Sequence, residues 1–290
     1  MTGVEEPLIR TEGLHYTYQA GTRKPVPALR GIDLAINAGE YVAVIGANGS
    51  GKSTLLRHFN ALLLPTVGSV WVTTWNTRDL AHLRDIRSTV GMVFQVPDDQ
   101  IVASTVEEDV AFGPENLGIP EEQLRQRVDW ALATVSLSEL RHRASRLLSA
   151  GQKQRLAIAS ALAMHPRCLV LDEATAMLDA AGKRCILETI HQLHQNGMTV
   201  VVATHEMAEA AQAQRVIVLS EGCIALQGSP HFVFAQEEIL QALQLDVPHP
   251  THLARTIATS VAAFPTDVLA VEELVNAAAM LLGPAPGGCR

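Results

Sequence analysis

The stretch YVAVIGANGSGKSTLL, residues 41–56, decides the fold. It joins a short apolar run, rich in β-branched residues, to a glycine-rich loop and then to a segment of helical character. The loop, residues 46–53, fits the pattern G-x-x-x-x-G-K-[ST]. Glycines let the backbone come close to phosphate oxygens, and the helix that follows adds the positive end of its dipole. The sequence therefore predicts a phosphate-binding loop between a buried strand and a helix.

The residue types in this loop predict individual roles. Lys52 can reach the β- and γ-phosphates of a nucleotide, and the hydroxyl of Ser53 can ligate Mg²⁺. A glycine-rich turn that matches by chance is the alternative, but the strand before the loop and the helix after it argue against that interpretation. The predicted nucleotide contacts in this segment are Gly46, Asn48, Gly49, Ser50, Gly51, Lys52, Ser53 and Thr54.

A second anchor is the acidic pair Asp172-Glu173 at the end of the apolar run CLVLDE. A carboxylate at the tip of a buried strand is costly and needs a reason. Asp172 is predicted to hold the Mg²⁺ shell, and Glu173 to polarise the attacking water. A strand-end carboxylate that caps the next helix is the alternative. Together with the phosphate-binding loop, the pair predicts a nucleoside triphosphatase.

Composition agrees with a layered α/β domain. Apolar residues make up 48 % of the 290 residues and aromatic residues only 4 %, so the core consists of Ala, Val, Leu and Ile. Alternating strand and helix patterns predict a mostly parallel core sheet. The net charge of −8 argues against nucleic acid as a partner, because a basic face supplies most of that binding.

Neither the cysteines nor the histidines of the sequence form a known metal-binding motif. The four cysteines are far apart and lack the spacing of metal ligands, so we expect reduced thiols. The stretch HEMAE, residues 205–209, lacks the second histidine of the HExxH pattern.

Strands, helices and breaks follow from the apolar periodicity. The expected strands are LHYTY, LRGIDLAI, YVAVIG, VGMVFQ, CLVLDE, MTVVVAT and the hairpin of RVIVLSEG with CIALQG. The expected helices are STLLRHFNALL, residues 79–89, most of residues 97–165, residues 180–196 and VEELVNAAAML, with breaks at Gly113-Pro114 and Gly118-Ile119-Pro120. The chain is expected to break at residues 247–250, and the tail GPAPGGCR to be disordered. Neither a signal peptide nor a stretch able to span a bilayer is predicted.

A third motif resembles that of a known family. LSAGQKQR, residues 148–155, is similar to the LSGGQ signature of ABC ATPases, and it precedes the acidic strand at the spacing of that family. Gln95, Asp179 and His205 lie where the family has its Q-loop, D-loop and switch residues. Tyr18 resembles the aromatic residue that stacks on adenine, with Tyr16 as the alternative. The resemblance covers residues 8–245.

The resemblance implies a P-loop NTPase fold of the ABC ATPase type, with a parallel core sheet, an antiparallel β subdomain, a helical subdomain and a short helical C-terminal extension. It implies residues 1–245 for the nucleotide-binding domain, 97–165 for its helical part and 246–290 for an extension that joins two ATPase subunits. ATP and Mg²⁺ are the implied cofactors. The implied catalytic residues are Glu173, His205 and Gln95, and the implied metal ligands are Ser53, Gln95 and Asp172. Ser149, Gly151, Gln152 and Asp179 are further implied nucleotide contacts, and in a head-to-tail dimer the signature of one chain completes the site of the other.

Two positions depart from the family pattern. Ala150 replaces the first glycine of the signature, which raises the question of a positive φ angle there. Ala174 replaces the usual proline after Glu173. Because Glu173 itself is present, we expect ATP hydrolysis.

The segment FQVPDDQIVASTVEEDVAFGPENLG resembles energy-coupling factor ATPases, including those of cobalt and nickel uptake, and GQKQRLAIASALAMHP with EATAMLD favours the first of two ATPase paralogues. The implied partners are a second ABC ATPase subunit (a paralogue or the same chain), a transmembrane coupling protein and a substrate-binding membrane protein. The implied cargo is a vitamin or a transition-metal ion, at the cytoplasmic face of the cell membrane. The acidic residues of this segment form either a docking site for arginines of the membrane partner or a solvated face. Another class of ABC transporter, or a soluble ABC ATPase without transport, is the alternative function.

Overall fold

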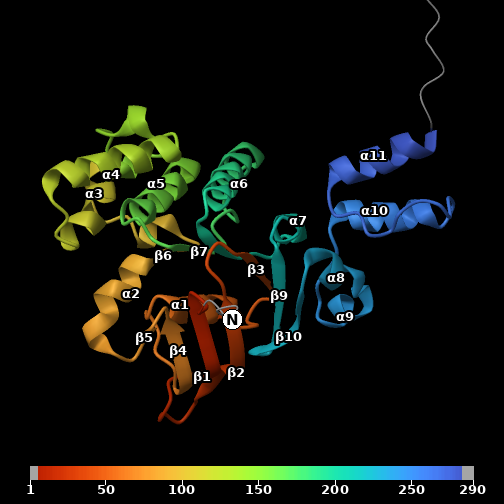
Figure 1. The fold of residues 1–290 in the computed structure, drawn as a ribbon, viewed down its shortest axis with the longest axis horizontal. Helices are drawn as coiled ribbons and strands as arrows, with labels where there is room; N and C mark the ends of the chain where they lie inside the picture. The colour runs from red at the N-terminus through yellow and green to blue at the C-terminus, as the bar shows by residue number, and fades with distance from the viewer. Residues whose placement is uncertain (1–5, 283–290) are drawn as a thin grey trace, which may run out of the picture.

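The computed structural model describes residues 6–282 and builds them around two β-sheets (Figure 1). In the larger sheet every neighbouring pair is parallel except the edge pair β10–β9. Its strands, in spatial order, are β10 (Cys223–Gly228), β9 (Arg215–Ser220), β3 (Tyr41–Ile45), β8 (Thr199–Ala203), β7 (Cys168–Asp172) and β6 (Val90–Val93). β3, β6, β7 and β8 are buried at every residue, because layers cover both faces, and this explains their unbroken apolar sequences.

The smaller sheet is antiparallel. Its strands, in spatial order, are β2 (Val26–Ile36), β1 (Ile9–Tyr18), β4 (Val67–Val72) and β5 (Trp75–Asn76). Burial alternates along β1 and β2 because one face packs on the core and the other faces water. The sequence predicted β1 and β2 but not β4 or the two-residue β5.

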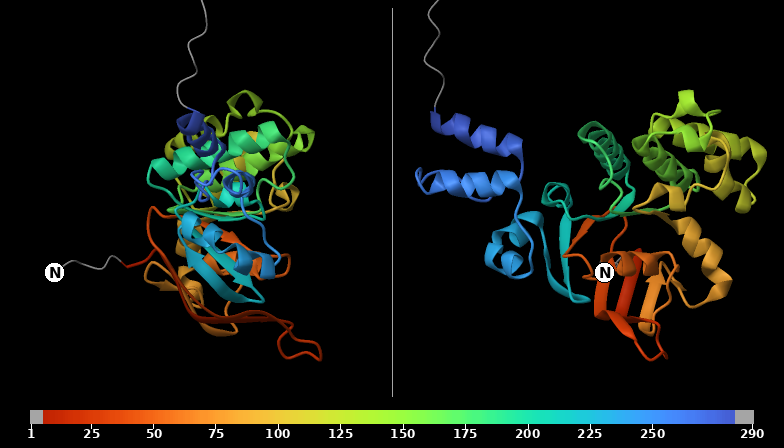
Figure 2. Two further views of the ribbon diagram at one scale, coloured as in Figure 1. Left: turned by 90° about the vertical axis from the view of Figure 1, so that its right-hand side faces the viewer. Right: turned by 180° about the vertical axis from the view of Figure 1, so that it is seen from behind.

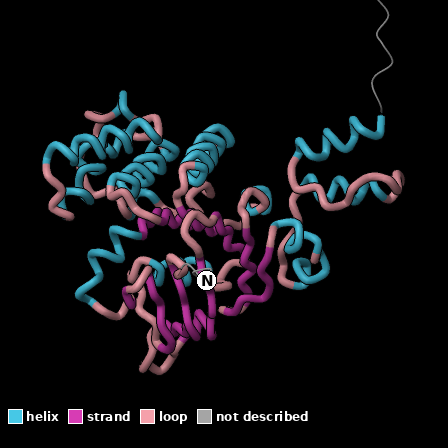
Figure 3. Tube along the Cα trace, in the orientation of Figure 1, coloured by secondary structure: helices cyan, strands magenta, loops and turns pink. Residues whose placement is uncertain are grey.

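Helices surround the parallel sheet (Figure 3). The helices next to the sheet are α1 (Lys52–Phe59), α2 (Leu83–Thr89), α6 (Ala180–Gln195) and α7 (Met207–Ala210). A separate helical block between β6 and β7 contains α3 (Val106–Asn116), α4 (Glu121–Thr134) and α5 (Ala150–Ala163). Short 3-10 turns are η1 (Leu80–His82), η2 (Pro97–Asp99), η3 (Ser138–Leu140) and η4 (Ser145–Leu147). The strands and helices predicted from periodicity are confirmed, and the hairpin of β9 and β10 is antiparallel as expected.

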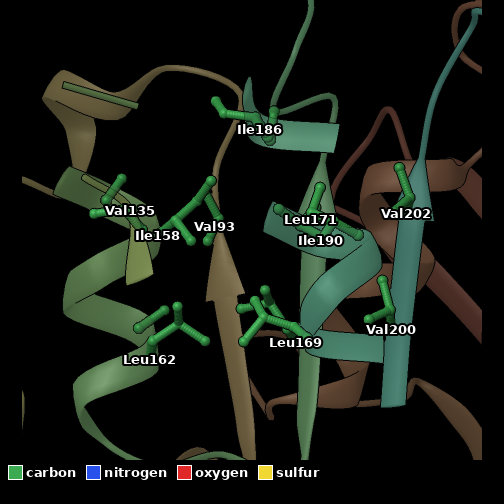
Figure 4. Close-up of a cluster of buried hydrophobic side chains, with 14 of the residues drawn as sticks. Val93, Val135, Ile158, Leu162, Leu169, Leu171, Ile186, Ile190, Val200 and Val202 are labelled. Atoms are coloured by element: carbon green, nitrogen blue, oxygen red, sulfur yellow. The ribbon is translucent and has the colours of Figure 1, made fainter. Parts of the chain in front are cut away.

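The main core lies between the parallel sheet and the helices α5 and α6. Figure 4 shows Leu169 and Leu171 of β7 next to Ile190 of α6, with Leu162 of α5 on the other side of the cluster. A second core lies on the opposite face of the sheet, where α1 and the antiparallel sheet pack. Phe59 of α1 is fully buried there. The parallel sheet is therefore fixed from both sides.

The predicted break at Gly113-Pro114 is wrong. Helix α3 continues through Pro114 to Asn116, and the amide of Leu117 donates to the carbonyl of Gly113 at 3.1 Å. A proline removes one N–H from the helix ladder, but Pro114 is buried against the rest of the helical block, and this packing outweighs the loss. The second predicted break is confirmed, since Gly118 has a φ of 63° after the end of α3.

The C-terminal part lies at the end of the molecule away from the helical block (Figures 1 and 2). It contains α8 (Pro230–Ala235), α9 (Glu237–Ala242), α10 (His249–Ala258) and α11 (Val271–Leu282), so the predicted break near residue 248 and the last helix are confirmed. Arg255 connects α10 to α8 and α9: it pairs with Glu237 of α9 and donates to the carbonyl of Phe234 of α8 at 2.8 Å. The tail GPAPGGCR lies outside the described residues. Across residues 6–282, none of the helices has the length and apolarity to cross a bilayer.

Replacing Leu169 by alanine tests the packing of β7 in the main core. Leu169 is fully buried, so Leu169→Ala leaves a cavity and lowers the free energy of unfolding by roughly 2–5 kcal/mol. Urea denaturation measures the change. Leu80→Ala is the matched control because Leu80 is 69 % exposed, and its expected effect is within about 0.5 kcal/mol. Equal effects of the two substitutions would contradict this description of the core.

Candidate functional site

The carboxyl ends of four neighbouring strands gather the predicted catalytic residues. The glycine-rich loop follows β3, Gln95 follows β6, Asp172-Glu173 ends β7, and His205 follows β8. Parallel strands point their carboxyl ends to one edge of a sheet, and ligands of open α/β sheets bind outside that edge. Residues from four distant parts of the chain therefore meet at one place.

Two glycines of the loop have no substitute in this backbone. A Cβ atom on Gly46 would stand 2.4 Å from the carbonyl oxygen of Leu219, so the loop lies directly on β9. Gly51 is the N-cap of α1 with a φ of 108°, and a Cβ there would lie 2.8 Å from the carbonyl oxygen of Ala28. Both glycines allow the close approach that brings the loop amides and the start of α1 to one side.

Lys52 is the buried cation of the site, with 5 % of its surface exposed. Its Nζ atom donates to the carbonyl of Gly46 at 2.8 Å and to that of Ala47 at 3.3 Å. The same atom lies 3.7 Å from Oε1 of Glu173. Lys52 thus lies between the loop and the acidic pair, which is the place its predicted contact with phosphates requires.

Ser53 and Asp172 meet directly. The Ser53 hydroxyl donates to Oδ1 of Asp172 at 2.8 Å. Burial raises the pKa of Asp172, and the hydrogen bond from Ser53 partly offsets this rise. Gln95 and Ser53 line one cleft, and Asp172 is hydrogen-bonded to Ser53. The groups available as metal ligands are therefore a hydroxyl, a carboxylate and an amide oxygen. These oxygen ligands fit Mg²⁺, which prefers few protein ligands together with phosphate oxygens and water.

Glu173 occupies a strained backbone position at the centre of the site. Its φ is 51°, in the left-handed region that non-glycine residues rarely adopt. Its Oε2 atom accepts from Nε2 of Gln95 at 3.0 Å and lies 3.6 Å from Nδ1 of His205. The structure therefore brings together all three predicted catalytic residues. A strained residue at such a point is typical of functional sites.

Tyr18 lines the cleft that also contains Gln95 and Glu173. The cleft has a volume of about 530 Å³ and is bounded by the start of β2, the glycine-rich loop, Gln95 and Glu173. The Tyr18 hydroxyl lies 3.1 Å from that of Thr54. Tyr16, the alternative aromatic, packs edge-on against His58 with the ring centroids 4.9 Å apart. The geometry favours Tyr18 as the aromatic residue next to a bound base.

The signature residues lie at the start of α5, in the helical block. Ser149 and Gln152 form a capping box, in which the Ser149 amide donates to Oε1 of Gln152 at 2.9 Å. Ala150 is the first residue of α5 and has a negative φ, so the expected difficulty of an alanine there does not arise. Within the described chain, Ser149, Gly151 and Gln152 are not among the residues that line the cleft. Asp179 caps α6 by accepting from the amide of Gly182 at 2.8 Å.

Sequence reasoning missed the side chains of Gln100, Gln154 and Glu209, which connect the segments around the site. Gln100 and Gln154 hold the two backbone groups of Phe94: Gln100 accepts from its amide at 2.8 Å, and Gln154 donates to its carbonyl at 3.4 Å. Glu209 is buried and accepts from two threonine hydroxyls. The one available signal for Glu209 was its position four residues after His205, in a stretch considered only as an incomplete metal motif.

Most acidic residues after Gln95 have partners within the chain. Asp98 pairs with Lys153, and Glu107 pairs with Arg141 at 2.6 Å. Glu108 completes the capping box of α3. Asp109 is buried and accepts from the amides of Val102 and Ala103 at 2.7 and 3.0 Å. These four carboxylates stabilise the start of the helical block, so the segment is not a uniform acidic surface.

Comparison with known proteins agrees with this geometry. A family model described as "ABC transporter" matches residues 29–176. The energy-coupling factor transporter ATP-binding protein EcfA1 of Caldanaerobacter subterraneus subsp. tengcongensis is 50 % identical over 270 residues, which are 93 % of this chain and 98 % of that protein.

Two solved structures are also similar to this chain. CbiO1 of Clostridium perfringens, described as part of an ABC transporter complex, is similar with a TM-score of 0.73 and 37 % identity over 87 % of this chain and all of that chain. The ATP-binding cassette MJ0796, in a dimer with ADP and phosphate, has a TM-score of 0.70 and 31 % identity over 77 % of this chain and 98 % of that chain.

Replacing Ala150 by glycine tests the conformation at the signature. Because Ala150 is helical, Ala150→Gly gains nothing in backbone freedom and lowers the free energy of unfolding by at most about 1 kcal/mol. We expect the ATP turnover of the variant to stay within twofold of the natural chain, as measured by phosphate release. A turnover several times higher would show that the methyl group hinders a contact made by this helix.

Proposed function

This chain belongs to the ABC transporter family and, within it, to the ATP-binding subunits of energy-coupling factor transporters. We propose that it powers import by hydrolysing ATP and that Glu173 polarises the attacking water. The single observation that carries the assignment of Glu173 is its position. Its carboxylate lies beside Lys52, Gln95 and His205 at the mouth of the phosphate-binding loop.

The loop residues bind and orient the nucleotide. Backbone amides from Gly46 to Ser53 and the start of α1 hold the phosphates, and Lys52 turns from the loop carbonyls toward the β- and γ-phosphates. Tyr18 stacks on the adenine at the other end of the cleft. His205, which is half exposed beside Glu173, contacts the γ-phosphate and orients the water.

Ser53, Asp172 and Gln95 would hold Mg²⁺, which would neutralise the charge that develops on the phosphates. Asp172 acts as an anion in this role, and the hydroxyl of Ser53 beside it is already oriented. Gln95 donates to Oε2 of Glu173 at 3.0 Å and so orients this carboxylate, which polarises the water.

A second ATPase subunit completes the site. The start of α5 presents Ser149, Gly151 and Gln152 away from the cleft of the same chain, so these groups serve the nucleotide of a partner subunit, and Asp179 contributes at the same interface. The C-terminal extension, residues 246–290, holds the two subunits together. On its last described helix, α11, Val271 and Val275 lie one turn apart on one face and are each 59 % exposed, which suits burial against a second copy or a paralogue.

A groove beside the Q-loop receives the transmembrane coupling protein. It has a volume of about 280 Å³ and lies between β6, α3 and α5. Its rim exposes Val102 and Phe112 at 63 % and 49 %. Asp99, which is exposed next to Gln100, adds a negative charge for a basic residue of the partner. The chain thereby acts at the cytoplasmic face of the cell membrane, and a separate membrane protein binds the vitamin or transition-metal ion.

Replacing Glu173 by glutamine tests the hydrolytic role. Glu173→Gln keeps the shape of the side chain but cannot accept a proton from water, so we expect turnover to fall roughly 10²–10⁴-fold while ATP still binds. Phosphate release and a fluorescent ATP analogue measure the two properties. Glu188→Gln, at an exposed position on α6, is the control and keeps full turnover. Turnover above a tenth of normal in Glu173→Gln would remove Glu173 from its proposed role.

Replacing Phe112 by aspartate tests the docking groove. Phe112→Asp puts a charge on the apolar rim of the groove, and we expect co-purification with the membrane partner to fall at least tenfold, because burying that charge on docking costs about 1.4 kcal/mol or more. ATP binding stays normal. Trp130→Asp is the matched control, because Trp130 is 40 % exposed on α4 and does not line the groove within the described chain. Normal recovery of the partner with Phe112→Asp would refute docking at this groove.

A further inference from the structure

Glu209 is a buried carboxylate at the carboxyl edge of the parallel sheet, with 2 % of its surface exposed. It lies on the short helix α7, one turn after His205. A buried carboxylate is costly unless hydrogen bonds and a counter-charge surround it. The partners of Glu209 come from three different catalytic segments of the chain.

Two threonine hydroxyls donate to the two carboxylate oxygens. The hydroxyl of Thr175, two residues after Glu173, donates to Oε1 at 2.5 Å. The hydroxyl of Thr204, directly before His205, donates to Oε2 at 2.6 Å. The Thr204 oxygen also accepts from the amide of Glu206 at 3.0 Å, which leaves its proton directed at Glu209.

Lys183 brings in the third segment. Its Nζ atom lies 3.2 Å from Oε1 of Glu209 and also pairs with Glu206. Lys183 is one turn after Asp179, whose side chain caps α6, and the Lys183 amide donates to the Asp179 carbonyl at 2.9 Å. Burial lowers the pKa of Lys183, but the hydrogen bond to Glu206 and the charge of Glu209 outweigh it and raise the pKa.

A backbone bond already joins two of these segments. The amide of Glu173 donates to the carbonyl of Ala203 at 3.0 Å, which aligns the ends of β7 and β8. The threonine bonds to Glu209 lie just beyond this point on each strand. The backbone bond fixes the strand ends, whereas the side-chain bonds fix the turns that carry Glu173 and His205.

We propose that Glu209 is a positioning residue for ATP hydrolysis: its carboxylate holds the turn of Glu173, the loop of His205 and the helix behind Asp179 in one arrangement. Within the described residues Glu209 does not line the cleft, so it acts through the residues that it holds. The proposal rests on the proposed function, because it assumes that Glu173 and His205 act on ATP. Glu173 has a left-handed φ, so its turn needs external support to stay in place.

The substitution Glu209→Gln tests this proposal directly, because glutamine has the shape of glutamate but only one hydrogen-bond acceptor group. With Glu209→Gln, one threonine proton loses its acceptor and Lys183 loses a charge partner. A misplacement of catalytic groups by about 1 Å costs up to roughly 10²-fold in rate. We therefore expect kcat to fall tenfold or more, while the KM for ATP and the Kd for a fluorescent ATP analogue stay within twofold.

Thr204→Val and Thr204→Ser separate positioning from general stability. Valine removes the hydroxyl and should lower kcat about as much as Glu209→Gln, whereas serine keeps the hydroxyl and should restore most of the rate. Thr189→Val is the control: Thr189 is also buried, on α6, but its hydroxyl donates to the Cys185 carbonyl at 2.9 Å, outside this network. Its kcat should remain within twofold of normal, whatever its melting temperature.

The outcomes distinguish the two proposals. Full-length variants are assayed in the purified transporter complex, with Glu173→Gln alongside. If Glu173→Gln stops turnover but Glu209→Gln and Thr204→Val keep a normal kcat, the positioning role is wrong and the proposed function stands. If Glu209→Gln loses ATP binding together with turnover, the residue maintains the fold and the positioning role is wrong. If Glu173→Gln itself keeps its turnover, the proposed function fails first.

Discussion

The level alignment of strand ends in the parallel sheet is the constraint on which the site depends. Ala203 of β8 pairs with Val44 of β3 on one side and with Asp172 of β7 on the other. The glycine-rich loop, the acidic pair and the switch histidine therefore begin at the same height above the sheet. A slip of one residue between any two of these strands would turn their side chains to opposite faces and separate the catalytic groups. The burial of these strands on both faces makes such a slip very costly.

The sheet also carries two buried charged side chains and one strained backbone position that the site requires. Lys52 and Asp172 are 5 % and 3 % exposed, and each needs partners at this depth. The loop carbonyls accept from Lys52, and Ser53 donates to Asp172. Glu173 adds a left-handed backbone. Strain of this kind persists only where the surroundings determine the conformation more strongly than the local preference does. Here the strand register and the packing of α1 and α6 supply that determination.

Much of this could be predicted from the sequence, because the signals were local. The loop from Gly46 to Ser53 combines a phosphate-binding motif with a strand before it and a helix after it, and the structure has that arrangement. The break at Gly113-Pro114 was wrong because packing of the helical block outweighs the local preference of proline. Glu209 could not be found, since the need for a buried carboxylate is visible only when Thr175, Thr204 and Lys183 meet in space.

The helical block and the cleft are connected through the residues around Phe94. The amide of Phe94 donates to Gln100, and its carbonyl accepts from Gln154. Gln154 lies on α5, two residues after Gln152 of the signature. Phe94 and Gln100 also line the groove proposed for the membrane partner, while Gln95, the next residue after Phe94, reaches into the cleft. A movement of α5 therefore changes the base of the Q-loop and the wall of the groove together. The same few contacts thus border the groove, the cleft and α5, and under the proposed docking they would link hydrolysis to the membrane partner.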